Sequence, residues 1–325
     1  LQGAEIAKEA AAADGIEVEL RVEDTQADPK LAVGAFQKLN SLGRLDGIIT
    51  YGSGVGVALS APSNQSKVIQ MGVATSTPAY KSADDFTFRS FPSAELESTF
   101  LVQQALRLNP QPNIAIVRIN NEYGLGTAKA FTAELEKAGG RVATEELLEP
   151  AAGEYRTQIA RLKTKNANII YLGSYPNEGA LFLKQAKEMG LTVPFVASVA
   201  IVGAKNFFAL AGGGAEGLLI GSSTPLYMED SSKEIREFNE RYLKRYGIDP
   251  SVQQMYAARA YDGVRAMVFA SKQCPEHDTS CMKEKLFSMQ NLSGPSGTLT
   301  FDRNGDVATE FSLLRVRDGK FERAD

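Results

Sequence analysis

The sequence predicts an α/β protein built from two doubly wound parallel sheets. Short β-rich runs alternate with amphipathic helical segments along most of the chain, and the alternation occurs in two successive sets. Strands that alternate with helices form parallel sheets covered on both faces. The length of 325 residues is also sufficient for two domains, each with its own core.

The first set begins with a helix and continues with two strands. Asp28 and Pro29 supply an N-cap and a first helical proline, and Gly43 ends the helix. We expect the buried face of this helix to consist of Leu31, Ala35, Leu39 and Leu42. Two strands follow, at 45–51 and 67–73.

The second set and the tail complete the predicted order of elements. Strands at 113–119, 142–148, 168–172, 193–197 and 215–222 alternate with helices at 93–108, 123–138 and 177–189 and a short one that contains Ile159. In the tail, the spacing Ser231-x-x-Glu234 is typical of a capping box that opens a helix. The chain ends with helices at about 251–272 and 279–289 and strand-like runs at 298–301 and 310–316.

Composition and charge exclude several classes of protein. With 35 basic and 39 acidic residues, the chain has a net charge of −4, the wrong sign for binding a phosphate backbone. No apolar stretch approaches the roughly 20 residues that span a bilayer. The hydrophobic fraction of 43% is too high for a disordered chain. We expect a soluble, globular, acidic protein.

The single histidine limits the chemistry that the chain can perform. A Ser-His-Asp or Cys-His site would have to use His277, and we expect no catalytic residues and no metal site. His277 lies in a polar loop between Cys274 and Cys281, which could be read as a partial zinc site without enough ligands. A local disulfide is the plainer interpretation and points to an oxidising compartment, and free thiols are the other alternative.

The turns after the predicted strands carry small and hydroxylated residues. These turns are 52–56, 74–77, 120–124, 173–175 and 198–199. In open α/β sheets, ligands bind at the carboxyl ends of the strands. Backbone N–H groups at helix N-termini, with Ser or Thr hydroxyls beside them, form a cradle for a carboxylate. Two tyrosines in these turns could cover an apolar ligand body, and the alternative for them is a core or rim position. The alternative for the Ser and Thr residues is a role as helix N-caps.

Short motifs occur in order along the whole chain. They are Leu1-Gln-Gly-Ala-Glu-Ile-Ala7, Val22-Glu-Asp-Thr-Gln-Ala-Asp-Pro29, Ser53-Gly-Val55, Ala74-Thr-Ser-Thr-Pro78, Phe88-Arg-Ser-Phe-Pro92, Glu122-Tyr-Gly124, Ala215-Glu-Gly217, Tyr256-Ala-Ala-Arg-Ala-Tyr-Asp262 and Phe301-Asp-Arg-Asn-Gly-Asp306. Through them the chain resembles the type I periplasmic binding proteins of the branched-chain amino acid ABC-transporter class.

This resemblance implies two lobes joined by three crossovers. Lobe one would comprise 1–91 plus 223–308, and lobe two 92–222 plus 309–325. The ligand would bind in the cleft between the lobes, and hinge closure would enclose it. The closed form would then be recognised by an ABC permease in the membrane.

The resemblance also implies which residues bind the ligand. They are Ser53, Ala74, Thr75, Ser76, Tyr123, Tyr175 and Val199. The hydroxyl and backbone N–H groups of Ser53 and Ser76 would hold a carboxylate, and the carbonyl of Ala74 would face the ligand head. Tyr123 and Tyr175, both from lobe two, would cover the ligand on closure.

The ammonium end of the site departs from the family's pattern. The family has an acidic residue at the position of Val199, and neither Ser198 nor Ala200 replaces it. Burying an ammonium group without an anionic partner costs on the order of several kcal/mol. Glu122 and Glu178 could substitute, although each is also a typical first-turn helix residue. We therefore expect a small carboxylate-bearing solute: a branched-chain or aliphatic amino acid, or a des-amino, keto or aromatic acid.

The start of the chain is a second departure. The family has a strand and a Ser-Gly-rich turn before its first helix, and this chain begins inside that helix. That first strand would lie inside the sheet of lobe one, so we expect a further segment to precede Leu1. A signal peptide or a lipid-anchored cysteine of the precursor would lie there.

Two other functions are alternatives. A nucleotide-binding oxidoreductase is suggested by 52–56, but the spacing is G-x-G-x-G, and Ser76 stands where an acidic residue would bind the ribose. The second alternative function is a ligand-sensing receptor or regulator domain of the same fold. We expect a monomer without enzyme activity or cofactor, which works outside the cytoplasm with an ABC permease and binds no nucleic acid.

Overall fold

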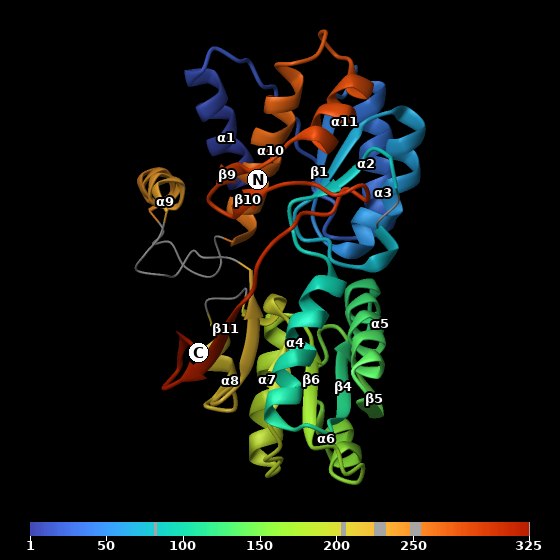
Figure 1. The fold of residues 1–325 in the computed structure, drawn as a ribbon, viewed down its shortest axis with the longest axis vertical. Coiled ribbons are helices and arrows are strands. Elements are labelled where there is room, and N and C mark those ends of the chain that lie inside the picture. Colours follow the sequence, from blue (N-terminus) through green and yellow to red (C-terminus); the bar gives the residue numbers. More distant parts are fainter. Residues whose placement is uncertain (81–82, 203–205, 224–231, 248–254, 325) are drawn as a thin grey trace. The chain divides into compact units, whose positions relative to one another are not determined.

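The chain divides into two compact units, each assembled from two stretches of sequence. A computed structural model describes residues 1–324, with gaps at 81–82, 203–205, 224–231 and 248–254 (Figure 1). Unit 1 consists of Leu1–Ser93 and Thr224–Thr309, and unit 2 of Ala94–Ser223 and Glu310–Asp325. We keep the names unit 1 and unit 2 below.

Unit 1 is built around a three-stranded parallel sheet in the order β1-β2-β3. These strands are β1 (Gly47–Thr50), β2 (Ile69–Gly72) and β3 (Thr87–Arg89). The helices are α1 (Gln2–Ala13), α2 (Pro29–Ser41), α3 (Ser53–Ser66), α9 (Lys233–Tyr246), α10 (Met255–Ser271) and α11 (Thr279–Ser288). Unit 1 also contains a separate antiparallel hairpin of β9 (Leu292–Gly294) and β10 (Gly297–Leu299).

Helices cover both faces of this sheet. Successive residues of a strand point to opposite faces. Ile48 packs with Phe36 of α2 and Leu59 of α3, whereas its neighbour Ile49 packs with Val264 of α10. The two-sided cover explains why all four residues of β2 are buried, the polar Gln70 included.

Unit 2 contains a seven-stranded sheet in the order β12-β11-β8-β7-β6-β4-β5. Its strands are β4 (Asn113–Ile119), β5 (Arg141–Leu148), β6 (Ile169–Gly173), β7 (Phe195–Ala197), β8 (Leu219–Ser222), β11 (Ser312–Arg317) and β12 (Lys320–Arg323). Its helices are α4 (Ala94–Leu108), α5 (Glu122–Lys137), α6 (Arg156–Leu162), α7 (Pro176–Glu188) and α8 (Phe207–Ala211), with the 3-10 helix η2 (Val199–Val202) after β7.

This larger sheet is also enclosed on both faces. Val196 of β7 belongs to a core with Leu101 of α4 and Phe131 of α5, while the adjacent Phe195 packs its ring on Phe182 of α7. The five strands from β5 to β8 run parallel. The α/β class predicted from the alternation of strands and helices is therefore confirmed.

The carboxyl-terminal strands differ from a purely parallel sheet. β11 pairs antiparallel with β8 and with β12, so the sheet of unit 2 is mixed. Asp318 and Gly319 join β11 to β12, and both have positive φ values, 50° and 70°. Two such residues form the tight turn that fits the twist of a hairpin. The sequence analysis did not predict β12 or the short strands β3 and β9.

The predicted buried face of α2 was wrong. Asp28 does cap the helix, since its side chain accepts hydrogen bonds from the backbone N–H groups of Lys30 and Leu31. The face turned to the core, however, contains Ala32 and Phe36. Leu31 is 49% exposed. Leu42, at the other end of the predicted face, is 62% exposed. The helix is turned by one residue relative to the leucine pattern because Phe36 fits between α3 and Val68.

The start of α9 also differs by one residue from the prediction. Ser232 is the N-cap, and its hydroxyl accepts a hydrogen bond from the backbone N–H of Ile235. Ser231 and residues 251–254 of the predicted helix 251–272 lie outside the described residues. Among the helices that are described, none is both long and apolar enough to cross a membrane.

Candidate functional site

A cradle of hydroxyl groups lies at the carboxyl ends of β1 and β2 in unit 1. Ser53 is the first residue of α3, directly after β1, and Ser76 follows β2. The backbone N–H of Ser76 donates to Oγ of Ser53 at 3.4 Å. Oγ1 of Thr75 donates to the carbonyl of Gly52 at 3.3 Å. The fold therefore brings together Ser53, Thr75 and Ser76, with Ala74 half-buried beside them.

The hydroxyl of Ser76 is the unusual group in this cradle. Ser76 is 1% exposed, and within the described part of the chain its Oγ has no hydrogen-bond partner. Buried polar side-chain atoms are nearly always hydrogen-bonded, so an exception calls for an explanation. The N-terminus of α3 beside it provides backbone N–H groups and a favourable field for an anion.

The glycines around the cradle allow its close packing. A Cβ on Gly56 would lie 2.8 Å from Oγ1 of Thr75, and one on Gly72 would lie 2.9 Å from Cβ of Thr75. Gly52 has a φ of 89°, a conformation that favours glycine. Gly56 is thus needed for the approach of Thr75 to α3 and Gly52 for its positive φ, and neither glycine requires a nucleotide to explain it.

Arg89 lies behind the cradle, and sequence analysis assigned it no role. It is fully buried, and its Nε donates to Oδ1 of Asp306 at 2.5 Å. Its Nη1 donates to the carbonyls of Thr77 at 3.0 Å and Thr75 at 3.4 Å. Binding these carbonyls fixes the backbone on either side of Ser76. The available signal was a charged residue inside the short phenylalanine-rich segment 86–91.

Two tyrosines come together at the carboxyl ends of β4 and β6 in unit 2. The chain runs from β4 to β5 on one side of β4 and then continues with β6 on the other side, so strand order reverses between β4 and β6. Such a switch point is where open α/β sheets bind ligands. Tyr123 follows β4 and Tyr175 follows β6, and their rings stack with centroids 5.1 Å apart and 12° between the planes.

The turn after β7 joins these tyrosines. The hydroxyl of Tyr123 lies 2.5 Å from Oγ of Ser198. Ala200 packs in the same cluster as Tyr123 and Tyr175. The three predicted site residues of unit 2, Tyr123, Tyr175 and Val199, therefore lie on adjoining turns.

Val199 has an acidic neighbour that the sequence pattern did not reveal. Its backbone N–H donates to Oε1 of Glu97 on α4 at 2.7 Å. Glu97 is 4% exposed, and this burial raises the pKa of its carboxyl group to about 7. The available signal was an acidic residue in line with Leu101 and Ala105 on the core face of α4.

The two glutamates considered as substitutes occupy different surroundings. Glu178 lies in the first turn of α7, and its Oε1 accepts a hydrogen bond from the backbone N–H of Ala151 at 3.1 Å. Glu122 lies half-buried in the first turn of α5. Glu97 is more deeply buried than either and is the one bonded directly to Val199.

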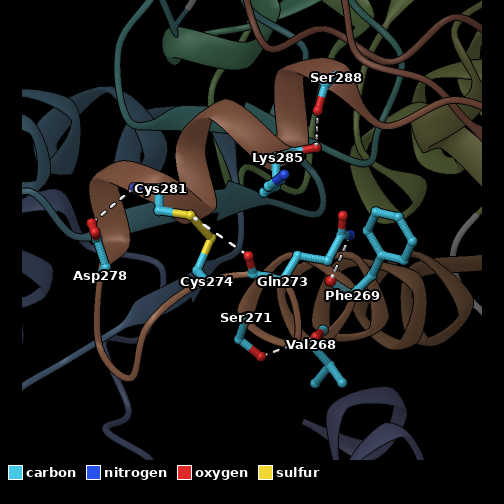
Figure 2. The surroundings of a disulfide bond; sticks show 9 residues. All are labelled: Val268, Phe269, Ser271, Gln273, Cys274, Asp278, Cys281, Lys285 and Ser288. Carbon is cyan, nitrogen blue, oxygen red and sulfur yellow. Dashed lines mark hydrogen bonds between the residues drawn. A yellow bond between two sulfur atoms is a disulfide. The ribbon is translucent and has the colours of Figure 1, made fainter.

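Cys274 and Cys281 form a disulfide bond, one of the alternatives left open by the sequence (Figure 2). Cys281 lies inside α11, which agrees with the helix expected at 279–289. Asp278 caps this helix by accepting a hydrogen bond from the backbone N–H of Cys281 at 2.9 Å. The described residues contain no cluster of three or more His, Cys, Asp or Glu side chains that could hold a metal ion.

Comparison with known proteins gives consistent results. Residues 1–320 match the sequence model of the family described as periplasmic binding protein. The Leu/Ile/Val-binding protein homolog 3 of Brucella melitensis is 21% identical over 320 residues, 97% of this chain and 84% of that protein.

Solved structures share the fold. The leucine binding protein LivK from Thermotoga maritima has a TM-score of 0.89 and 22% identity, covering 100% of this chain and 92% of that one. The branched-chain amino acid transporter substrate binding protein LivJ from Streptococcus pneumoniae, in complex with isoleucine, has a TM-score of 0.84 and 20% identity. That match covers 99% of this chain and 91% of the other.

Proposed function

Because this chain belongs to the periplasmic binding protein family, a family of binding proteins rather than enzymes, we propose that it captures a small carboxylate-bearing solute for an ABC importer. The chain is homologous to branched-chain amino acid binding proteins. A branched-chain or aliphatic amino acid and its keto or des-amino counterparts are the ligands that we propose, with aromatic acids as a further class. The protein would act as a monomer outside the cytoplasm and deliver its ligand to a membrane permease.

The hydroxyl of Ser76, which has no hydrogen-bond partner among the described residues, carries this proposal. A ligand carboxylate would accept a hydrogen bond from that hydroxyl and from backbone N–H groups at the start of α3. Charge-assisted bonds of this kind are about twice as strong as neutral ones. The buried hydroxyl, without a partner in the described part of the chain, would thereby gain one on binding.

The tyrosines of unit 2 would supply the second half of the binding site. Stacked rings offer a large apolar surface that suits the side chain of a hydrophobic ligand. Engagement of one ligand by residues from both units would couple capture to hinge closure, and the closed form would be the state that the permease recognises.

A thermal-shift screen against paired ligands tests the proposal. Each pair consists of an L-amino acid and its keto acid, for example leucine and 4-methyl-2-oxopentanoate. A ligand at 100 times its Kd stabilises the native state by about 2.7 kcal/mol, which is a measurable rise in Tm. We expect at least one member of a pair to raise the Tm. Absence of a shift with amino, keto and aromatic acids alike would overturn the proposal and favour a sensor of larger ligands.

A further inference from the structure

Glu97 is a buried acidic residue that has no ion-pair partner among the residues the structure describes. Among the described residues, no lysine, arginine or histidine forms a salt bridge with it. Its Oε1 accepts the backbone N–H of Val199, and its Oε2 has no hydrogen bond to any described residue. A charge buried in this way is costly unless a cation accompanies it.

The described residues of the elements packed around Glu97 supply no such cation. The segment Phe195–Val202, which includes β7 and η2, contains no titratable side chain, and β8 contains none either. Tyr171 of β6 faces Glu97, and burial raises the pKa of its hydroxyl, so it is neutral at pH 7. Tyr123 of α5 reaches the same turn through Ser198. On α4 itself the neighbouring titratable residue is Glu95, another acid.

We propose that Glu97 is the anionic partner of the ligand's ammonium group, in place of the acidic residue that position 199 lacks. The carboxyl group lies directly behind the turn where that acid is missing and is bonded to its backbone. It would lose a proton to the solvent when an amino acid binds, because a nearby cation favours the carboxylate form. This inference rests on the proposed function, and it assigns the residue that distinguishes amino acids from keto acids.

Proton release separates this role from a purely structural one. At pH 7 a carboxyl group whose pKa is about 7 is about half protonated, so leucine binding should release up to about half a proton. Binding of 4-methyl-2-oxopentanoate should release none from Glu97, since this ligand brings no cation. Calorimetric titrations in phosphate and in Tris, whose ionisation enthalpies differ, measure the number of protons released.

The variant Glu97→Gln keeps an oxygen for the N–H of Val199 but removes the charge. We expect its affinity for leucine to fall at least about tenfold, as for loss of a hydrogen bond to a charged group, and its proton release to disappear. Its affinity for the keto acid should stay within about twofold. Glu95→Gln is the matched control, since it removes the same charge from the same turn of α4, and it should behave as wild type.

The outcomes are distinct for the two proposals. Equal weakening of both ligands, or unchanged leucine binding in Glu97→Gln, would overturn the role of Glu97 and leave the proposed function standing. A wild-type protein that binds only the keto acid, or that binds leucine without releasing protons, would also overturn the role of Glu97 and leave the proposed function standing. If wild type binds neither ligand class, both proposals are overturned. The wild-type proton count does not depend on how well the variant folds.

Discussion

Replacing Ser76 by alanine tests the carboxylate cradle most directly. The hydroxyl of Ser76 is buried and unpaired among the described residues, so its loss removes no hydrogen bond from the free protein. A hydrogen bond from this hydroxyl to a ligand carboxylate would contribute about 1.5–3 kcal/mol. We therefore expect Ser76→Ala to weaken binding of leucine and of 4-methyl-2-oxopentanoate by about 10- to 150-fold.

The stability of the free protein provides the second part of this prediction. Because an unsatisfied buried hydroxyl is unfavourable, Ser76→Ala should leave the free energy of unfolding unchanged or raise it by about 1 kcal/mol. Urea unfolding without ligand measures this change, and calorimetry with each ligand measures the affinity. A variant that is both weaker in binding and strongly destabilised would point to general disruption instead.

Ser63 offers a matched control on the same helix. It is fully buried, and its Oγ also has no partner within the described residues. It lies ten residues after Ser53, about 15 Å along α3. Ser63→Ala should therefore change stability in the same way as Ser76→Ala and leave affinity unchanged. Wild-type affinity in Ser76→Ala, or an equal loss in Ser63→Ala, would refute the assignment of the cradle.

Three further predictions concern stability. Arg89→Met should lower the free energy of unfolding by about 3–5 kcal/mol, since it leaves Asp306 as an uncompensated buried charge; a urea midpoint close to that of wild type would contradict this. The native state retains the proton of Glu97 between about pH 4.5 and 7, where the unfolded chain releases it, so this group's contribution to stability falls as pH rises and is lost above pH 7. Urea midpoints at pH 5 and pH 8 should therefore differ less in Glu97→Gln than in wild type, and an equal difference would exclude this residue as the source. The double replacement Cys274→Ser and Cys281→Ser opens a short loop and should lower the free energy of unfolding by about 2–3 kcal/mol, which is measured as a lower Tm. Ligand affinity should not change, and a loss of affinity would contradict this prediction.

The sequence alone determined the features that depend on neighbouring residues. Periodicity located β4 within its observed bounds and most other strands of unit 2 within a few residues, because buried parallel strands are continuous apolar runs. Asp28 and Pro29 located the start of α2, since capping is completed within one turn. The placement of small, hydroxylated and tyrosine residues after strands suggested the candidate site, whose role in binding remains a prediction.

Only the tertiary structure decided which distant residues meet. Glu97 and Val199 are separated by 102 positions, and Arg89 and Asp306 by 217. Neither pair has a local pattern, because their contact depends on how α4 packs on β7 and how the segment after β10 returns to β3. The buried face of α2 and the antiparallel direction of β11 also depend on contacts with distant parts of the chain. A local pattern fixes the period of an element, but the neighbours that exclude water from it determine which face is buried and which charges come together.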